Sequence, residues 1–222
     1  MTGGPEDPPA DGWAAHDLRV AVEAGLARGR HLLTAGEAHV ARRVLALEGP
    51  AATVYARMVG RKPVAFPMDA FTVPEPVADV GVAVDELAAL GLVDQLVPWS
   101  WRAELSTRAR LAEGCRRLGL RRSGKRGELE ERLRSRQGWD PTRWVRPRHR
   151  ALIKRLQRFA TLRAWPQEHD VVLERLGTVA YVDHPITTGP ALFPDRHGLL
   201  AWESLLVRLA DGSLGVAEAL EA

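Results

Sequence analysis

The sequence predicts a mainly α-helical protein with a small β element before a C-terminal helix. Apolar residues recur at spacings of three, four and seven over most of the chain, which is the repeat of a helix with one buried face. Glycine and proline interrupt these runs where helices would end. β-branched residues gather in one stretch, 171–182, where we expect a strand or two, followed by a helix over 199–209.

The N-terminal part is expected to form a flexible tail, 1–16, and a helical domain, 17–101. Within this domain the apolar spacing predicts two helices between 17 and 47, with a break near Gly29. A third helix is predicted over 51–59, after a Gly-Pro pair that marks its start.

A short extended piece follows the third predicted helix. Pro74 and Pro76 exclude helix at its end, because proline fixes φ and lacks an N–H group. Helical spacing resumes over 77–90, and Gly91 stands where a glycine would end that helix. The order of helix, extended piece and helix resembles a winged-helix unit.

The charge of the chain is strongly asymmetric. Residues 102–163 hold 20 Lys and Arg against 6 Asp and Glu, a net charge of +14, whereas the other residues hold 11 basic and 22 acidic side chains, a net charge of −11. A basic block of this kind attracts polyanions, and nucleic acid is the polyanion we expect it to bind. The alternative is a solvated arginine-rich surface without a nucleic-acid partner.

Several function classes are not supported by the sequence. No stretch approaches the roughly 18 consecutive apolar residues of a membrane span, and the N-terminus does not read as a signal peptide. We therefore expect an intracellular, cytoplasmic protein with no membrane partner, nucleoid-associated if prokaryotic. The single cysteine, Cys115, and the scattered histidines suggest no metal site, and no nucleotide-binding glycine motif occurs.

Residues 102–138 resemble the SAP motif, a DNA-binding helix-loop-helix. The resemblance lies in two leucine-bearing helices and the basic loop between them: Leu118, Gly119, Leu120, Ser123, Gly124, Lys125, Arg126, Leu129 and Leu133. The alternative is a plain helical hairpin with a basic loop.

Physical reasons support this loop as a phosphate site. Gly119 can take a positive φ and end the first helix, which is expected to run unbroken from Arg102. Gly124 allows the backbone to approach a phosphate, and Ser123 is placed to cap the second helix, whose N-terminal amides favour anions. The candidate DNA contacts in the loop are Arg121, Arg122, Ser123, Gly124, Lys125 and Arg126.

The segment 139–170 is expected to be a stiff connector followed by a basic helix over 148–163. The proposed duplex path crosses the loop and this helix, with a further contact near residue 61. The additional candidate residues are Arg61, Lys62, Arg148, Arg150, Lys154, Arg155 and Arg158. Four tryptophans flank the basic block and either stack on unpaired bases or, as we favour, close a small core: Trp99, Trp101, Trp139 and Trp144.

Three segments in one order resemble the Fanconi-associated nuclease family. The segment 54–62, Val-Tyr-Ala-Arg-Met-Val-Gly-Arg-Lys, is similar to a motif of that family, and a helix containing Leu87 and the SAP-like hairpin follow in the same order. The segment 181–203 is similar to the part that leads into the family's helical repeats, so 171–222 would hold the β element and the start of that region.

The resemblance implies a structure-selective DNA repair nuclease of the phosphodiesterase I type, a 5′-flap endonuclease or exonuclease linked to interstrand cross-link repair. Its nuclease module would lie downstream, in cis or in trans, and would need Mg²⁺ or Mn²⁺. The expected Asp/Glu-x-Lys motif is not found: Lys62, Lys125 and Lys154 are the only lysines, and none has an acid two positions before it. No catalytic residue or cofactor is therefore assigned to this chain.

The sequence thus favours the DNA-binding portion of such a nuclease, binding duplex or branched DNA through backbone phosphates. Whether the chain has enzymatic activity is left open. The alternatives are a stand-alone nucleic-acid-binding adaptor, for DNA or RNA, and a protein-interaction module.

Overall fold

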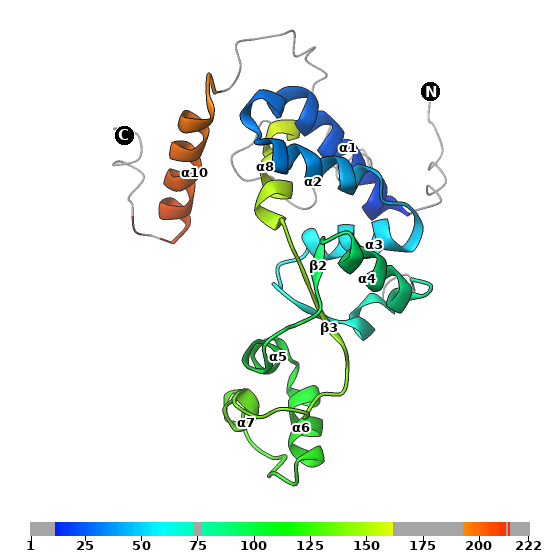
Figure 1. Ribbon diagram of the computed structural model, residues 1–222. Helices are drawn as coiled ribbons and strands as arrows, with labels where there is room; N and C mark the ends of the chain where they lie inside the picture. Colours follow the sequence, from blue (N-terminus) through cyan, green and yellow to red (C-terminus); the bar gives the residue numbers. More distant parts are fainter. Residues whose placement is uncertain (1–11, 73–76, 162–192, 212, 214–222) are drawn as a thin grey trace, which may run out of the picture. The chain divides into compact units, whose positions relative to one another are not determined.

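A computed structural model describes residues 12–72, 77–161, 193–211 and 213, and confirms a mainly helical protein (Figure 1). The described residues form two compact units that interleave along the chain. Among the described residues, the first contains 12–16, 47–72 and 77–150, and the second contains 17–46, 151–161, 193–211 and 213. The contacts therefore group 17–46 with the C-terminal part rather than with 47–101. The β element expected at 171–182 lies outside the described residues.

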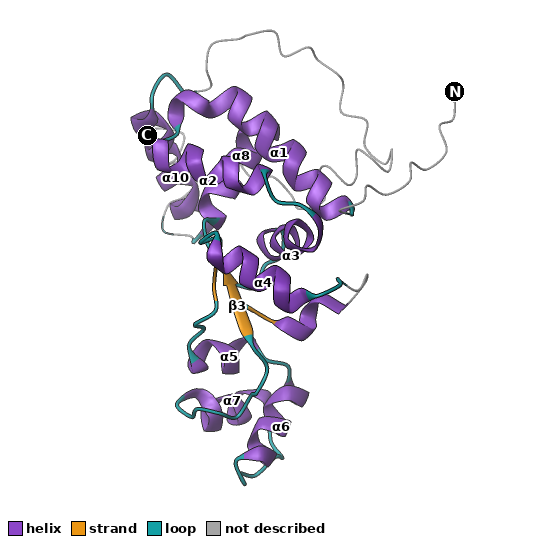
Figure 2. Cartoon of the chain, turned by 45° about the vertical axis from the view of Figure 1, so that its right-hand side comes forward, coloured by secondary structure: helices purple, strands orange, loops and turns teal. Residues whose placement is uncertain are grey.

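The first unit contains a small antiparallel sheet with helices around it (Figure 2). Its elements, in chain order, are α3 (Gly49–Val59), β1 (Phe66–Pro67), the 3₁₀ helix η2 (Met68–Thr72), α4 (Val80–Ala89), β2 (Val93–Asp94), α5 (Trp99–Leu105), α6 (Arg108–Arg117), α7 (Arg126–Arg134) and β3 (Trp144–Pro147). The start of α4 departs from common capping, because its N-cap Asp79 has φ +48 and makes no side-chain cap. Its end follows the sequence prediction: Gly91 has φ +66, and Leu92 N donates to Leu87 O at 2.9 Å.

The sheet has the order β1-β3-β2, so that β3 is the central strand. Phe66 pairs with Val145 on one side of β3, and Val93 pairs with Pro147 on the other. Helices α3 and α4 pack against one another beside it, and the hydroxyl of Tyr55 donates to Arg148 O at 3.0 Å just beyond β3. The core of this part consists of aliphatic and aromatic side chains: Val54, Tyr55, Met58, Phe66, Phe71, Val84, Leu87, Leu92 and Val145 are buried.

A three-helix hairpin, α5 to α7, lies between β2 and β3 in the chain and has a core of its own. The sequence predicted one unbroken helix before the loop, and this was wrong. Ser106 adopts an extended conformation after α5, and the hydroxyl of Thr107 caps α6 by accepting from Arg110 N at 3.3 Å. Apolar side chains from all three helices and from Trp139 fill the centre: Ala103, Leu111, Cys115, Leu129 and Leu133.

The second unit is helical in its described residues. It contains most of α1 (Trp13–Gly29), the 3₁₀ helix η1 (Arg30–Leu32), α2 (Ala35–Leu45), α8 (Arg150–Thr161) after its first residue, and α10 (Arg196–Ala210). The expected break near Gly29 is confirmed. Helix α1 meets α8 at glycines: a Cβ on Gly25 would overlap the Leu156 backbone, and one on Gly29 would overlap the Phe159 ring. These glycines therefore allow the close approach of the two helices.

An ion-pair network joins α2, α8 and α10 within this unit. Arg155 donates to both carboxylate oxygens of Glu203, at 2.9 and 2.7 Å, and also to Glu37. Arg196 reaches Glu37 at 2.6 Å, and Thr34 forms a capping box with the same glutamate. The burial of Glu37 would by itself raise its pKa, but hydrogen bonds from Arg196 and Thr34 and the charge of Arg155 lower it to about 2.

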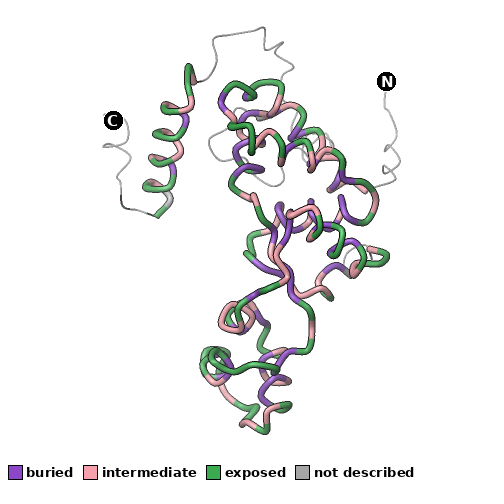
Figure 3. The backbone as a smooth tube through the Cα atoms, in the orientation of Figure 1, coloured by how far each residue is buried: buried purple, intermediate pink, exposed green. Residues whose placement is uncertain are grey.

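Within residues 12–72, 77–161 and 193–213, none of the helices combines the length and the apolar character that crossing a lipid bilayer requires. The tube in Figure 3 shows instead that each helix alternates between buried and exposed positions.

Candidate nucleic-acid interface

The basic loop of the hairpin begins at a well-defined helix end. Gly119 follows α6 with φ +69, as the sequence predicted. Leu120 N donates to Cys115 O at 2.8 Å, and Gly119 N donates to Arg116 O at 3.1 Å. This pair of bonds is the Schellman motif, which satisfies helix carbonyls and turns the chain away from the helix axis. Leu120 then packs against the hairpin core, so the loop leaves from a fixed point.

Two arginines hold the backbone of the loop. Arg132 on α7 donates from one Nη1 to Arg121 O at 2.8 Å and to Ser123 O at 2.9 Å. Arg108 on α6 donates to Gly124 O at 3.3 Å from both Nε and Nη2. Three loop carbonyls therefore point toward protein donors. Because carbonyl oxygens repel phosphate oxygens, this arrangement favours an anion on the outer side of the loop.

The sequence was wrong about the start of α7. Its N-cap is Lys125, with no side-chain cap, whereas the hydroxyl of Ser123 accepts from Arg121 Nε at 2.9 Å. Gly124 has φ +139, and a Cβ at this position would lie 2.5 Å from Glu128 Oε2. The positive φ favours glycine here, whereas the Glu128 carboxylate lies at the end of a flexible side chain that can move away.

The six loop candidates have different surroundings. Arg121, Arg122 and Lys125 are exposed. Arg126 is also half-exposed, but its guanidinium donates to Glu104 O and to Ser106 O and lies 3.5 Å from Glu130. The loop thus presents three outward cations close together in sequence, together with one cation that also ties α7 to the end of α5.

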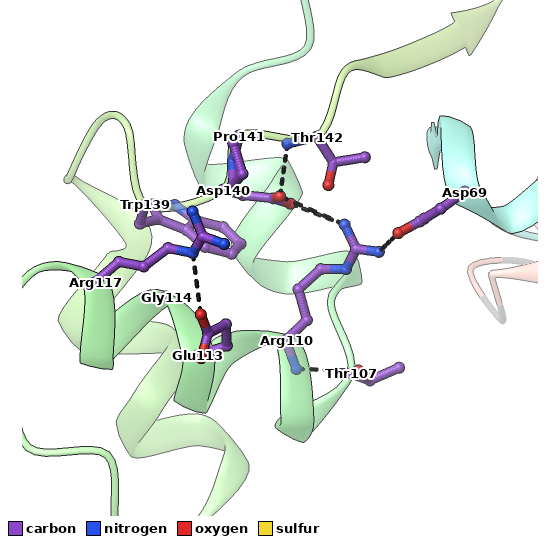
Figure 4. A pocket seen from close by; sticks show the side chains of 10 residues that line it. All are labelled: Asp69, Thr107, Arg110, Glu113, Gly114, Arg117, Trp139, Asp140, Pro141 and Thr142. Atoms are coloured by element: carbon purple, nitrogen blue, oxygen red, sulfur yellow. Dashed lines mark hydrogen bonds and ion pairs between the residues drawn. The ribbon is translucent and has the colours of Figure 1, made fainter.

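The base of the hairpin is fixed by a buried carboxylate (Figure 4). Asp140 accepts from Trp144 Nε1 at 2.8 Å, from Thr142 N at 3.0 Å and from Arg110 Nη1 at 3.1 Å. Arg110 also donates to Asp69 on η2 and so links the hairpin to the sheet side of the unit. Burial would raise the pKa of Asp140, but the hydrogen bonds from Trp144, Thr142 and Arg110 reverse this and lower it. The carboxylate is therefore a structural anchor, charged over the whole physiological range.

A groove of about 330 Å³ runs along α6 beside this anchor (Figure 4). Its walls carry charges of both signs, with Arg110 and Arg117 against Glu113 and Asp69. Arg117 is paired with Glu113 at 3.1 Å. This mixed charge makes the groove a poorer match for a polyanion than the loop is.

The candidates around residue 61 and at the start of α8 are brought together within the first unit. Arg150 donates to Pro63 O at 2.8 Å and to Lys62 O at 3.5 Å, and also to Arg61 O. Its guanidinium thus binds backbone carbonyls. Lys62 is exposed, and Arg148 is half-exposed with its Nε 3.9 Å from Asp94.

The remaining candidates lie on α8 in the second unit. Lys154 is exposed, whereas the Arg155 side chain is only 9% exposed and is occupied by two glutamates. Arg158 pairs with Glu203 at 3.1 Å. These arginines were predicted to be phosphate contacts because a sequence shows how many arginines a segment holds but not which groups they bind. Their carboxylate partners on α2 and α10 argue for a structural role instead.

The tryptophans flanking the basic block divide into two pairs. Trp139 and Trp144 are 1% and 2% exposed, which confirms the core interpretation for them. Trp99 and Trp101 are only half-buried, and each lies under an arginine: Arg102 is 4.2 Å from the Trp99 ring centre, and Arg146 is 5.5 Å from that of Trp101.

Sequence reasoning missed Arg108 and Arg132 as functional residues. The only sequence signal for Arg132 is its spacing of four from Glu128, with which it pairs at 3.4 Å. Among the described residues, no group of three or more His, Cys, Asp or Glu is arranged to hold a metal ion.

The chain was compared with known proteins. No protein-family model matches it, and no curated protein matches it. Its fold is similar to a crystal structure of paFAN1 bound to DNA with a two-nucleotide 5′ flap and a gap, with a TM-score of 0.77 and 23% identity over 98% of this chain and 42% of that one. A second paFAN1 structure, with a one-nucleotide 5′ flap and a gap, gives a TM-score of 0.72 and 22% identity over 91% and 39%. The chain thus spans about two fifths of the paFAN1 chains, and at this identity the similarity establishes a shared fold.

Proposed function

We propose that this chain is the DNA-binding part of a structure-selective DNA repair nuclease and that its basic loop, 121–126, contacts backbone phosphates. The observation that carries the proposal is the loop itself: Arg121, Arg122 and Lys125 are exposed while the loop carbonyls are held by Arg108 and Arg132. Contacts of this kind position DNA without reading its sequence.

The order of elements supports a winged-helix assignment for the sheet part of the first unit. A helix, a strand, a second short helix, a third helix and two strands follow one another, with the last strand central in the sheet. The third helix, α4, exposes Val82, Asp85 and Glu86. An acidic face repels phosphates, so we assign the DNA contact to the SAP-like hairpin between the last two strands rather than to α4.

The relation to a nuclease is supported by the three family-like segments and by the fold shared with paFAN1, whose structures contain flap DNA. Metal-dependent cleavage would require carboxylates that hold Mg²⁺ or Mn²⁺, and the described residues do not supply such a group. We therefore place the cleavage chemistry in a nuclease module, in cis or in trans, acting inside the cell.

Binding of fluorescent duplex and 5′-flap DNA at several salt concentrations tests the proposal. The test variant replaces four loop cations by alanine: Arg121, Arg122, Lys125 and Arg126. A charge-matched control replaces four exposed arginines elsewhere on the hairpin: Arg116, Arg117, Arg134 and Arg136. We expect the loop variant to bind at least about tenfold more weakly and to lower the slope of log K against log salt by ~0.9 for each lost contact.

Three results would count against the proposal. Equal losses in the loop variant and in the control would mean that only the net charge of the hairpin matters. No binding of the wild type to either DNA at low salt would favour a protein-interaction module. Tighter binding to matched RNA than to DNA would favour a nucleic-acid adaptor.

A further inference from the structure

A second pocket, of about 430 Å³, lies in the first unit where the chain enters and leaves the hairpin. Residues from both ends of the hairpin line it, among them Leu96, Trp99, Pro141 and Arg143. Leu96 is 91% exposed, which makes it the most exposed large apolar side chain among the described residues. A single exposed leucine is common on protein surfaces, and Leu96 is relevant here because it lines this pocket.

The ring of Trp99 is held in place at this pocket. The Arg102 guanidinium lies 4.2 Å from the ring centre and is itself fixed by bonds to Val97 O at 3.0 Å and Thr142 O at 3.5 Å. Trp139 packs at 6.3 Å from the ring with an interplanar angle of 57°. Trp99 nevertheless remains half-buried, so part of its surface faces the pocket. A preorganised aromatic ring binds another flat ring with little loss of side-chain entropy.

Arg143 places a cation on the pocket wall. Its Nη2 is engaged by Asp85 at 2.6 Å and by Gln95 at 2.8 Å, while 49% of the side chain stays exposed. The two acceptors fix the direction of the guanidinium without covering it. Asp85 offsets part of the charge of Arg143, but both acceptors bind Nη2 alone, so the N–H groups on Nε and Nη1 can donate to a phosphate oxygen.

We propose that this pocket binds one unpaired nucleotide, with the base against Leu96 and Trp99 and the phosphate at Arg143. The volume falls within the range of about 300–1,000 Å³ typical of small-ligand sites. An apolar and aromatic wall beside a cation matches a nucleotide, which joins a flat base to an anion. The inference rests on the proposed DNA-binding function and adds a single-stranded element to it.

The test compares two DNAs that share one duplex and differ only in a short single-stranded overhang. The test variant is Leu96→Ala, and the matched control is Val82→Ala on α4, where the valine is 68% exposed and lies outside the pocket. Both changes trim exposed apolar side chains, so both variants are expected to keep the fold. We expect Leu96→Ala to weaken overhang binding on the order of fivefold. Duplex binding and the salt slope should stay unchanged, and Val82→Ala should behave like the wild type.

A fluorescent base gives a second readout. With 2-aminopurine at the first unpaired position, wild-type binding should quench the emission through contact with Trp99, and Leu96→Ala should weaken this quenching. If Leu96→Ala binds and quenches like the wild type while the loop variant loses duplex binding, the pocket assignment is wrong and the proposed function stands. An equal loss on duplex and overhang DNA would also overturn it, because the leucine would then contact paired DNA. If the wild type binds no DNA, the proposed function and this inference both fail.

Discussion

The clearest prediction concerns Arg132, whose side chain holds the loop backbone. Arg132→Met keeps most of the side-chain volume and removes the two bonds to Arg121 O and Ser123 O, at 2.8 and 2.9 Å. A hydrogen bond from a charged donor contributes ~1.5–3 kcal/mol when buried. Because this side chain is 28% exposed, and water can replace its bonds, we estimate about 1 kcal/mol for each bond.

Without these two bonds, ordering the loop when DNA binds should cost ~2 kcal/mol more than in the wild type. The affinity for DNA should therefore fall about 30-fold. The control is Arg134→Met, which removes one charge two residues further along α7. The slope of log K against log salt should be the same for Arg132→Met as for this control. Arg121→Ala, in contrast, should lower the slope by ~0.9. The measurement is fluorescence anisotropy across a salt series, with circular dichroism to confirm the fold.

Two outcomes would contradict this role of Arg132. If Arg132→Met lowers the slope as much as Arg121→Ala does, Arg132 itself contacts a phosphate. If its affinity equals that of Arg134→Met, the loop does not depend on the held carbonyls.

Three further predictions concern stability. Gly114→Ala would place a Cβ 2.5 Å from Trp139 Cε3, so we expect ~1–3 kcal/mol of destabilisation in urea unfolding, and an unchanged midpoint would contradict the packing described. Asp140→Asn replaces one carboxylate oxygen by an NH2 group, which would face donors such as the buried Trp144 Nε1. We expect a loss of ~2 kcal/mol in thermal unfolding, whereas a neutral effect would show that the carboxylate is dispensable. Glu37 has a folded pKa of about 2, below its usual value, so its stabilisation is complete above about pH 5 and is lost as the pH falls toward 2. The loss should be ~1–2 kcal/mol after allowance for its partial exposure, and Glu37→Gln should flatten the acid branch of the stability curve.

The helical elements were largely predictable, because each depends on local patterns. Gly91 and Gly119 were correctly expected at helix ends, since a positive φ after a helix strongly favours glycine. The break at Ser106 and Thr107 was missed: the apolar spacing continues across it, and only the cap geometry reveals it. A hydroxyl residue inside an otherwise helical pattern can therefore indicate that one helix ends and another begins there.

The sequence predicted an extended piece where β1 lies, but it did not predict β2, β3 or the pairing of the three strands. β1 and β2 have only two residues each, too few to show an alternating pattern. β3 lies between prolines in a segment expected to be a connector, and its pairing partners are 50 to 80 residues away in sequence. Pairing over such distances depends on tertiary packing rather than on local preference.

For the candidate interface, the sequence identified the loop but not the differences among its arginines. All arginines carry the same charge in a sequence, whereas in the structure Arg132 binds carbonyls, Arg155 binds glutamates and Arg121 is exposed. These roles follow from acceptors that are distant in the chain or belong to the backbone. Net charge therefore led to the prediction that a polyanion binds the basic block, but it did not distinguish the arginines that are exposed from those that bind protein groups.

The position of the hairpin between two paired strands has an evolutionary consequence. Asp94, the last residue of β2, is opposite Arg146 in β3, so the chain leaves the sheet there and re-enters it at Trp144, two residues from the paired position. A segment whose ends are this close can be gained, lengthened or exchanged in a single genetic event without changing the register of its host. Selection can thus act on the hairpin and on the scaffold separately, and relatives that share the scaffold can differ in what they carry at this point.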